Sequence, residues 1–128
     1  MKIKDSIVLV TGANRGIGKA YAEEFLKAGA KKIYLGVRDP KSVENFVKQN
    51  PDKLIPLKLN VTNASDIKDA VKKAQDVTIL INNAGVAHMG NLFGLGQFDY
   101  ARAEMEVNYF GPLHMIRSFA PVLKKNGG

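Results

Sequence analysis

Residues 7–20 read IVLVTGANRGIGKA, an apolar run that passes into a loop with three glycines. The run Ile7–Val10 is typical of a buried strand, and a helical pattern extends from about Gly16 to Ala28, with Gly29 as its expected stop. Glycines allow a tight turn and close approach of a ligand, and a helix that begins in such a loop directs its first N–H groups at an anion. The stretch therefore predicts a phosphate-binding loop between a strand and a helix.

The remaining sequence repeats this alternation of short apolar runs and helical patterns. We expect strands at Lys32–Gly36, Leu54–Val61 and Val77–Asn82, helices at Ser42–Gln49, Ala64–Ala74 and Tyr100–Leu123, and a glycine-rich loop at Ala84–Gln97. This order predicts an α/β fold of the Rossmann type, a doubly wound parallel sheet with strand order 3-2-1-4 that is truncated before a fifth strand. Pro56 agrees with this order, because proline is tolerated in an edge strand and strand 3 lies at the edge. We expect residues 1–128 to form one domain.

Composition and charge narrow the class of protein. The chain has 128 residues, of which 45% are hydrophobic and 24% charged, and it has no cysteine, which excludes disulfides and cysteine metal sites. We expect a cytoplasmic protein without a membrane partner, since the only apolar run of the segment MKIKDSIVLV is Ile7–Val10, too short for export or spanning. The formal charge of +7 comes from basic residues spread along the chain, so we expect no nucleic-acid partner. His88 and His114 have no third ligand at useful spacing, and no metal site is expected.

The spacing of the glycines selects among phosphate loops. A P-loop needs a hydroxyl residue after its lysine, but Ala20 follows Lys19, and the spacing Gly-x-Gly-x-x-Gly is absent as well. The pattern TGxxxGxG at residues 11–18 instead resembles that of the short-chain dehydrogenases/reductases. Three more stretches resemble motifs of this family in the expected order: LNVT at 59–62, NNAG at 82–85 and VNYFG at 107–111. The resemblance covers the whole chain and corresponds to the N-terminal, cofactor-binding half of a family member.

This resemblance implies a function. Family members are NAD(P)(H)-dependent oxidoreductases that transfer a hydride between nicotinamide and a small carbonyl or alcohol substrate, and we expect a homo-oligomer. The residues that the resemblance assigns to dinucleotide binding are Gly12, Asn14, Arg15, Gly16, Ile17, Gly18, Arg38, Asn60, Val61, Asn82, Ala84 and Gly85. Asn108 resembles a catalytic residue of the family's proton relay, linked through water to a catalytic lysine.

Two arginines favour NADP as the cofactor over NAD. The acid that selects NAD in the family would align with Val37, which has no charge, and Arg38 follows directly. Arg15 resembles a second basic position, and a guanidinium can hold a phosphate with two parallel hydrogen bonds. Asp39 is the rival, because NAD would be favoured if its carboxylate faced the ribose. Asn60 departs from the family, in which an aspartate commonly helps to hold the adenine; asparagine keeps an acceptor oxygen and adds donors.

Pro112 lies four residues after Asn108, inside the expected last helix. Proline has no N–H, so the carbonyl of Asn108 is expected to lack its helical partner and to be able to hold a water beside the crevice. The alternative is a simple kink near Gly111-Pro112. The sequence supports both interpretations with the same geometry.

Reduction of a carbonyl needs an acid that protonates the developing alkoxide. The family supplies it with Tyr-x-x-x-Lys and a serine, and none of the four tyrosines of this chain begins that motif. We therefore expect these catalytic groups beyond this chain and predict that the chain alone is inactive. Either it is a fragment of a longer protein, or the open edge of its fourth strand pairs with another copy or chain. The alternative functions are a non-catalytic dinucleotide-binding module and a basic interaction domain without nucleotide binding.

Overall fold

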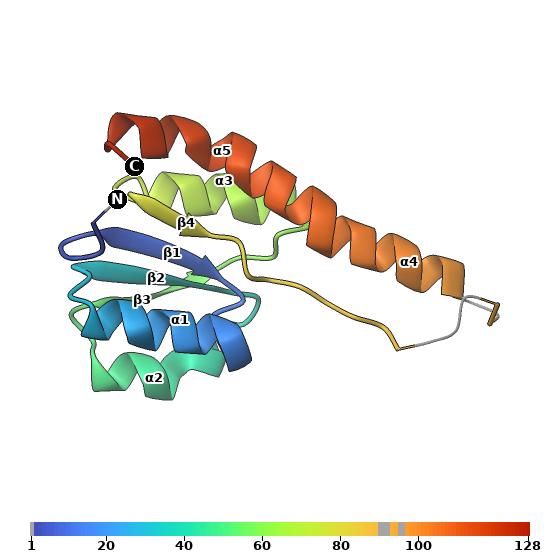
Figure 1. Cartoon of the computed structure of the whole chain (residues 1–128), viewed down its shortest axis with the longest axis horizontal. Coiled ribbons are helices and arrows are strands. Elements are labelled where there is room, and N and C mark those ends of the chain that lie inside the picture. Colours follow the sequence, from blue (N-terminus) through green and yellow to red (C-terminus); the bar gives the residue numbers. More distant parts are fainter. Residues whose placement is uncertain (1, 90–92, 95–96) are drawn as a thin grey trace.

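Four parallel strands form one sheet in the order β3-β2-β1-β4, which confirms the predicted topology (Figure 1). The strands are β1 (Ile7–Thr11), β2 (Lys32–Val37), β3 (Leu54–Lys58) and β4 (Ile79–Ile81). At the centre of the sheet, Leu9 pairs with Tyr34 on one side and with Leu80 on the other. The structure is a computed structural model that describes residues 2–89, 93–94 and 97–128.

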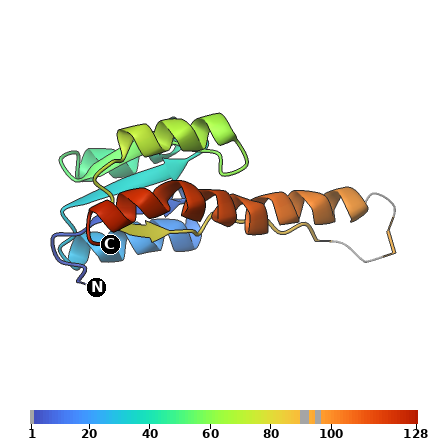
Figure 2. The ribbon, with the colours of Figure 1, turned by 90° about the horizontal axis from the view of Figure 1, so that it is seen from above.

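Helices cover both faces of this sheet, as expected for a doubly wound fold. One face carries α1 (Gly16–Lys27) and α2 (Glu44–Gln49), and the other carries α3 (Ala64–Lys73) and α5 (Gly111–Lys125) (Figure 1). A short 3-10 turn, η1 (Pro40–Val43), precedes α2. Figure 2 shows that α4 (Gln97–Met105) and the π-helical turn η2 (Glu106–Phe110) continue the line of α5 past the end of the sheet. Over the described residues, no helix combines the length and the apolar character that crossing a membrane requires.

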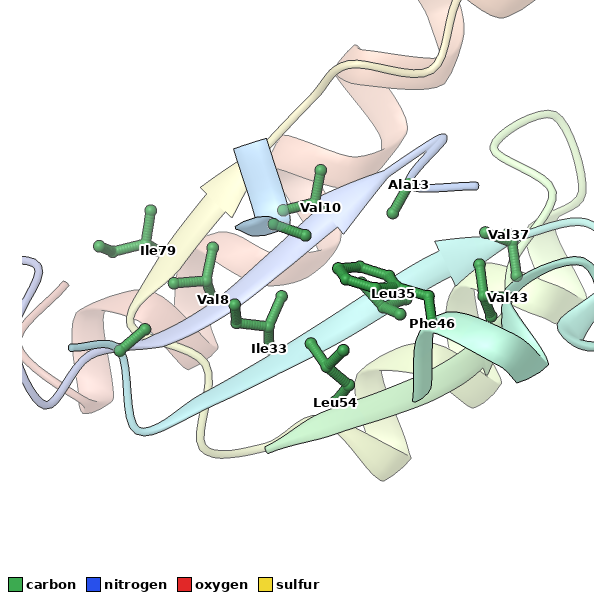
Figure 3. Packing of buried hydrophobic residues seen from close by; sticks show 12 residues of the cluster. Val8, Val10, Ala13, Ile33, Leu35, Val37, Val43, Phe46, Leu54 and Ile79 are labelled. Atoms are coloured by element: carbon green, nitrogen blue, oxygen red, sulfur yellow. The ribbon is translucent and has the colours of Figure 1, made fainter. Parts of the chain in front are cut away.

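Side chains that alternate along the strands form two apolar layers, because successive strand residues point to opposite faces. Toward α1 and α2, fully buried valine, isoleucine and leucine side chains pack with Phe46 (Figure 3): Val8, Val10, Ile33 and Leu35. Toward α3 and α5, the buried layer contains Leu9, Tyr34, Leu57, Ile67, Met115 and Phe119. Both faces of β1 are therefore covered, which explains its continuous apolar sequence.

The edge strand β3 contains Pro56, in agreement with the prediction. The predicted continuation of this strand to Val61 is wrong, because β3 ends at Lys58. Two residues later the Asn60 N–H donates to a carboxylate oxygen of Asp66 at 3.0 Å. This bond directs the chain toward α3, and residues 59–61 leave the sheet at its C-terminal edge.

Three other predicted boundaries are corrected by the structure. The strand expected at 77–82 pairs only over Ile79–Ile81, because the chain beyond it bonds to the Thr11 side chain. The helix expected at 42–49 is divided into η1 and α2, and the one expected at 100–123 spans residues 97–125 with η2 inside it. The loop expected at 84–97 falls partly outside the described residues. Gly29 does follow the end of α1, with a φ of 84° that suits glycine.

A polar cluster lies at the N-terminal end of β2. The Lys32 ammonium group is 2.6 Å from one carboxylate oxygen of Asp76, and the Tyr34 hydroxyl donates to the other at 2.9 Å. Burial alone would raise the pKa of Asp76, but the hydrogen bonds from Lys32 and Tyr34 outweigh it and lower that pKa below its ordinary 3.8. The hydrogen bond to Asp76 raises the pKa of Lys32, and burial raises the pKa of Tyr34.

Candidate functional site

A crevice of about 470 Å³ opens at the C-terminal ends of β1 and β2. Ligands of open parallel sheets bind at this edge. Its walls are the glycine loop after β1, the turn after β2, residues 59–61 after β3, residues 83–86 after β4, and Val107 of η2. The sheet order brings these five segments together although they are spread over most of the chain.

The glycine loop packs directly against the segment that follows β4. Gly12 has a φ of 68°, and a Cβ atom there would lie 3.0 Å from the Ala84 Cα atom. A Cβ atom on Gly18 would overlap the carbonyl oxygen of Gly12. Glycine at both positions therefore keeps the loop close to its neighbours and leaves the start of α1 facing the crevice.

The N-terminus of α1 has the properties of an anion site. Arg15 is the N-cap residue, its side chain makes no capping hydrogen bond, and the first turn contains no acidic residue. The first N–H groups of a helix have no partner inside the helix, and the helix dipole adds partial positive charge. Gly16, Ile17 and Gly18, which form the first turn, all line the crevice.

A buried hydroxyl joins β1 to the segment after β4. Thr11 is 1% exposed, and its Oγ1 atom accepts the N–H groups of Asn83 and Ala84, both at 2.9 Å. The same hydroxyl donates to the Ile81 carbonyl at 3.3 Å. The Asn83 side chain adds hydrogen bonds from Nδ2 to the carbonyls of Thr11 and Gly12. Together these bonds hold Ala84 and Gly85 at the crevice wall.

The turn after β2 presents two charges of opposite sign, and both Arg38 and Asp39 line the crevice. One oxygen of the Asp39 carboxylate, Oδ1, accepts the Lys41 N–H at 3.0 Å and caps η1. Arg38 precedes it, is exposed and lines the crevice, as does Arg15 on the glycine loop. Within the described part of the chain, neither guanidinium has a hydrogen-bond or ion-pair partner.

Asn60 and Val61 form the wall next to that turn. The Asn60 Oδ1 atom accepts the N–H of Thr62 at 3.1 Å and the hydroxyl of Thr62 at 2.9 Å. Gly111 approaches Val61 so closely that a Cβ atom on it would lie 2.8 Å from the Val61 Cγ2 atom. This contact fixes the start of α5 against residues 59–61.

Asn108 lies on η2 and binds the segment that leaves β4. Its Oδ1 atom accepts the Val86 N–H at 2.9 Å, and its Nδ2 atom donates to the Val86 carbonyl at 2.8 Å. The irregularity that Pro112 predicted is a π-helical turn, in which the Gly111 N–H donates to the Glu106 carbonyl five residues earlier. Both polar atoms of the Asn108 side chain therefore bond to the backbone of Val86, a residue that lines the crevice.

His88 follows on the same segment and also contacts α4, beside which the segment runs in Figures 1 and 2. The His88 ring stacks on the Tyr100 ring with centroids 4.9 Å apart. The backbone N–H of His88 donates to the Glu104 carboxylate. Tyr100, Glu104 and Asn108 are four residues apart, so they share one face of this helical stretch. Among the residues described, no three histidine, aspartate or glutamate side chains group to hold a metal ion.

The crevice contains every predicted dinucleotide-binding residue except Asn82. Its neighbour Asn83 lines the crevice instead, and the NNAG motif did not distinguish the two. Sequence reasoning did not assign five other lining residues to the site, although Leu59 and Val107 belong to the LNVT and VNYFG motifs: Gly36, Ser42, Leu59, Val86 and Val107. Asn108 does not line the crevice itself but reaches it through Val86.

Known proteins share both this sequence pattern and this fold. The chain matches the short chain dehydrogenase family over residues 6–128. It is similar to the structure of a short chain dehydrogenase from Burkholderia cenocepacia J2315 in complex with NADP, with a TM-score of 0.92 and 43% identity, covering 100% of this chain and 52% of that one. It is also similar to a short chain dehydrogenase/reductase from Burkholderia phymatum in complex with NAD, with a TM-score of 0.84 and 26% identity, covering 100% and 47%.

A relative named for its activity is also similar in sequence. The NADP-dependent 3-hydroxy acid dehydrogenase of Schizosaccharomyces pombe is 32% identical over 99% of this chain and 52% of its own length. The chain thus spans about half the length of each of these three proteins. Sequence, fold and crevice agree, and the chain belongs to the short chain dehydrogenase family.

Proposed function

We propose that this chain binds NADP(H) and forms the cofactor-binding portion of an oxidoreductase that transfers a hydride between nicotinamide and a carbonyl or alcohol substrate. The observation that carries the choice of NADP is the pair of free guanidinium groups of Arg15 and Arg38 at the crevice. Asp39, the residue that would favour NAD, has one of its two carboxylate oxygens engaged in capping η1, whereas both guanidinium groups are free of partners among the described residues. One similar structure contains NADP and another contains NAD, so the preference rests on these side chains.

We assign each part of the dinucleotide to one wall of the crevice. The pyrophosphate is proposed to lie at the N-terminus of α1, where N–H groups and the helix dipole favour negative charge. Arg38 and Arg15 would bind the 2′-phosphate, because a planar guanidinium can form two parallel hydrogen bonds with it. The adenine would lie against Asn60 and Val61, and the nicotinamide ribose against Ala84 and Gly85. When bound, the cofactor supplies or accepts the hydride.

Asn108 is proposed to act through its backbone carbonyl in the proton relay of the complete enzyme. Its side chain is directed to the backbone of Val86, and we assign the water of the relay to its backbone carbonyl. Pro112 cannot donate to that carbonyl because it has no N–H. The chain contains no Tyr-x-x-x-Lys sequence, so the acid that protonates the alkoxide would come from residues other than 1–128.

The complete protein is proposed to be a cytoplasmic homo-oligomer. Large apolar side chains recur at helical spacing on the outer surface of α4, η2 and α5, each between 39% and 56% exposed: Met105, Tyr109, Leu113 and Ile116. Such a stripe is a surface that a second copy could cover. The family match favours the oxidoreductase over a non-catalytic dinucleotide-binding module, and the crevice gives no support to a basic interaction domain without nucleotide binding.

Titration of the chain with NADPH and NADH tests this proposal. We expect the chain to bind NADPH more tightly than NADH. Arg38→Ala should lower the affinity for NADPH by roughly 10- to 100-fold, the effect of removing a hydrogen bond between charged groups. The affinity of this variant for NADH should change little. Arg117→Ala, an exposed arginine of α5 away from the crevice, is the matched control and should leave both affinities unchanged. Equal losses for the two cofactors would refute the assignment of Arg38.

A further inference from the structure

The orientation of the Asn60 amide is determined by Thr62. The backbone N–H of Thr62 lies 3.1 Å from Oδ1, and a backbone N–H can only donate, so the atom that faces it must be the oxygen. The Thr62 hydroxyl donates to the same oxygen. The polar group that Asn60 can offer to a ligand is therefore Nδ2, which has no acceptor in the described part of the chain.

Val61 supplies a second donor next to it. The Asn60 N–H is occupied by Asp66, but no acceptor for the Val61 N–H lies within the described residues. Val61 lines the crevice and is only 6% exposed. A backbone N–H of a buried residue normally has a partner, so this donor is available to a ligand. The wall proposed for the adenine thus presents two donors and no side-chain acceptor from Asn60.

Two donors do not select adenine. The Watson–Crick edge of adenine presents one donor group, the 6-amino group, and one acceptor, N1. Hypoxanthine presents the reverse, an acceptor at O6 and a donor at N1. A pair of donors can therefore form one hydrogen bond with either base, to N1 of adenine or to O6 of hypoxanthine. In both cases the second donor of the pair faces a donor of the base. An aspartate beside the Val61 N–H would instead give one acceptor and one donor, which match adenine twice and oppose hypoxanthine twice.

We propose that Asn60 makes this crevice tolerant of the base, so that the chain binds 6-oxopurine dinucleotides about as tightly as adenine dinucleotides. This inference rests on the proposed function, since it requires the purine to lie against residues 60 and 61. The specificity-determining residue is Asn60, and Thr62 is the positioning residue that directs Nδ2 rather than Oδ1 to the ligand.

The test compares NADPH with reduced nicotinamide hypoxanthine dinucleotide phosphate, by titration followed through nicotinamide fluorescence. We expect the two affinities of the wild-type chain to agree within about threefold, because each base loses one of two contacts. Asn60→Asp preserves the acceptor for Thr62 but turns the free atom into an acceptor. This variant should favour NADPH by at least about tenfold, because adenine gains a hydrogen bond to a charged group while hypoxanthine loses its one matching contact. The two ligands carry equal charge, so the general effect of the new carboxylate cancels in their ratio.

Asn63→Asp is the matched control. Asn63 caps α3 by accepting the Asp66 N–H, a role that aspartate can also fill, and it does not line the crevice. The Asn63→Asp substitution adds the same charge three residues away and should leave the ratio of the two dinucleotide affinities unchanged. A wild-type preference for NADPH above tenfold would overturn the inference whether or not the Asn60→Asp chain folds. An unchanged ratio in a folded Asn60→Asp chain would overturn it as well. If neither dinucleotide binds the wild-type chain, the proposed function fails and this inference fails with it.

Discussion

Replacing Thr11 by valine removes one hydroxyl from the junction between the glycine loop and the segment after β4. Valine has nearly the same shape and suits a strand equally well. The hydroxyl it lacks accepts the N–H groups of Asn83 and Ala84 at 2.9 Å and donates to the Ile81 carbonyl. The substitution therefore tests the hydrogen bonds alone, with little change in packing.

The expected loss of stability follows from the two N–H groups that would have no partner. A buried donor without a partner costs about 1–3 kcal/mol, so two cost about 2–6 kcal/mol. Asn83 and Ala84 are only half-buried, and water relieves part of this cost, which brings the expected loss to about 2–4 kcal/mol. For a chain of 128 residues this loss corresponds to a fall in Tm of roughly 7–15 °C.

Urea unfolding followed by circular dichroism measures this loss, with Thr11→Ser as the control. Serine keeps the hydroxyl and loses one methyl group, at a cost of about 1 kcal/mol. NADPH titration should also separate the variants, because only valine releases Ala84 and Gly85 from the crevice wall. If the free energies of unfolding of the two variants agree within about 0.5 kcal/mol, the hydroxyl does not hold this junction and the reasoning is refuted.

Three further predictions concern other parts of the molecule. The pKa of Asp76 is lowered in the fold, so its stabilisation is complete above pH 3.8 and is lost as the pH falls through the folded pKa. The pKa of Lys32 is raised in the fold, so its stabilisation is complete below pH 10.5 and is lost as the pH rises through the folded pKa. Asp76→Asn should therefore flatten both limbs of the profile of unfolding free energy against pH, and unchanged limbs would contradict the pairing. Asn108→Ala should speed amide hydrogen exchange at Val86 by about tenfold, through loss of about 1.4 kcal/mol of local stability, whereas Asn108→Asp keeps the acceptor for that N–H and should speed it less. Ile116→Glu, at a position 52% exposed, should reduce the mass of the oligomer in light scattering, and a wild-type monomer would refute the proposed assembly.

The sequence predicted the arrangement of the sheet because the signals for it are local. Strong apolar runs gave the strands, and Pro56 identified the edge strand without reference to any other residue. The strand ends were predicted poorly for a physical reason. β4 stops where two N–H groups turn to Thr11, a residue about seventy positions earlier, and no local pattern marks such a bond.

The last helix illustrates the same limit. Pro112 correctly predicted an irregularity near Asn108, because the missing N–H of proline is a property of that residue alone. The form of the irregularity depends on contacts between segments. Gly111 lies against Val61 with no room for a Cβ atom, and the Asn108 side chain forms two hydrogen bonds with the backbone of Val86 at the crevice wall. Neither contact is visible from the spacing of residues along the chain.

Asn60 lies between these two cases. The chemistry of an amide allows an asparagine both to donate and to accept, so the residue type by itself left its contact with adenine undefined. The contact is defined by Thr62, only two residues later, whose N–H and hydroxyl both claim Oδ1. Turns of this kind, in which an asparagine side chain accepts the N–H two residues on, are common in loops and are local in sequence. The polarity of this wall could therefore have been inferred from Asn60 and Thr62 together, and the Asn60→Asp ratio tests that inference without altering the turn.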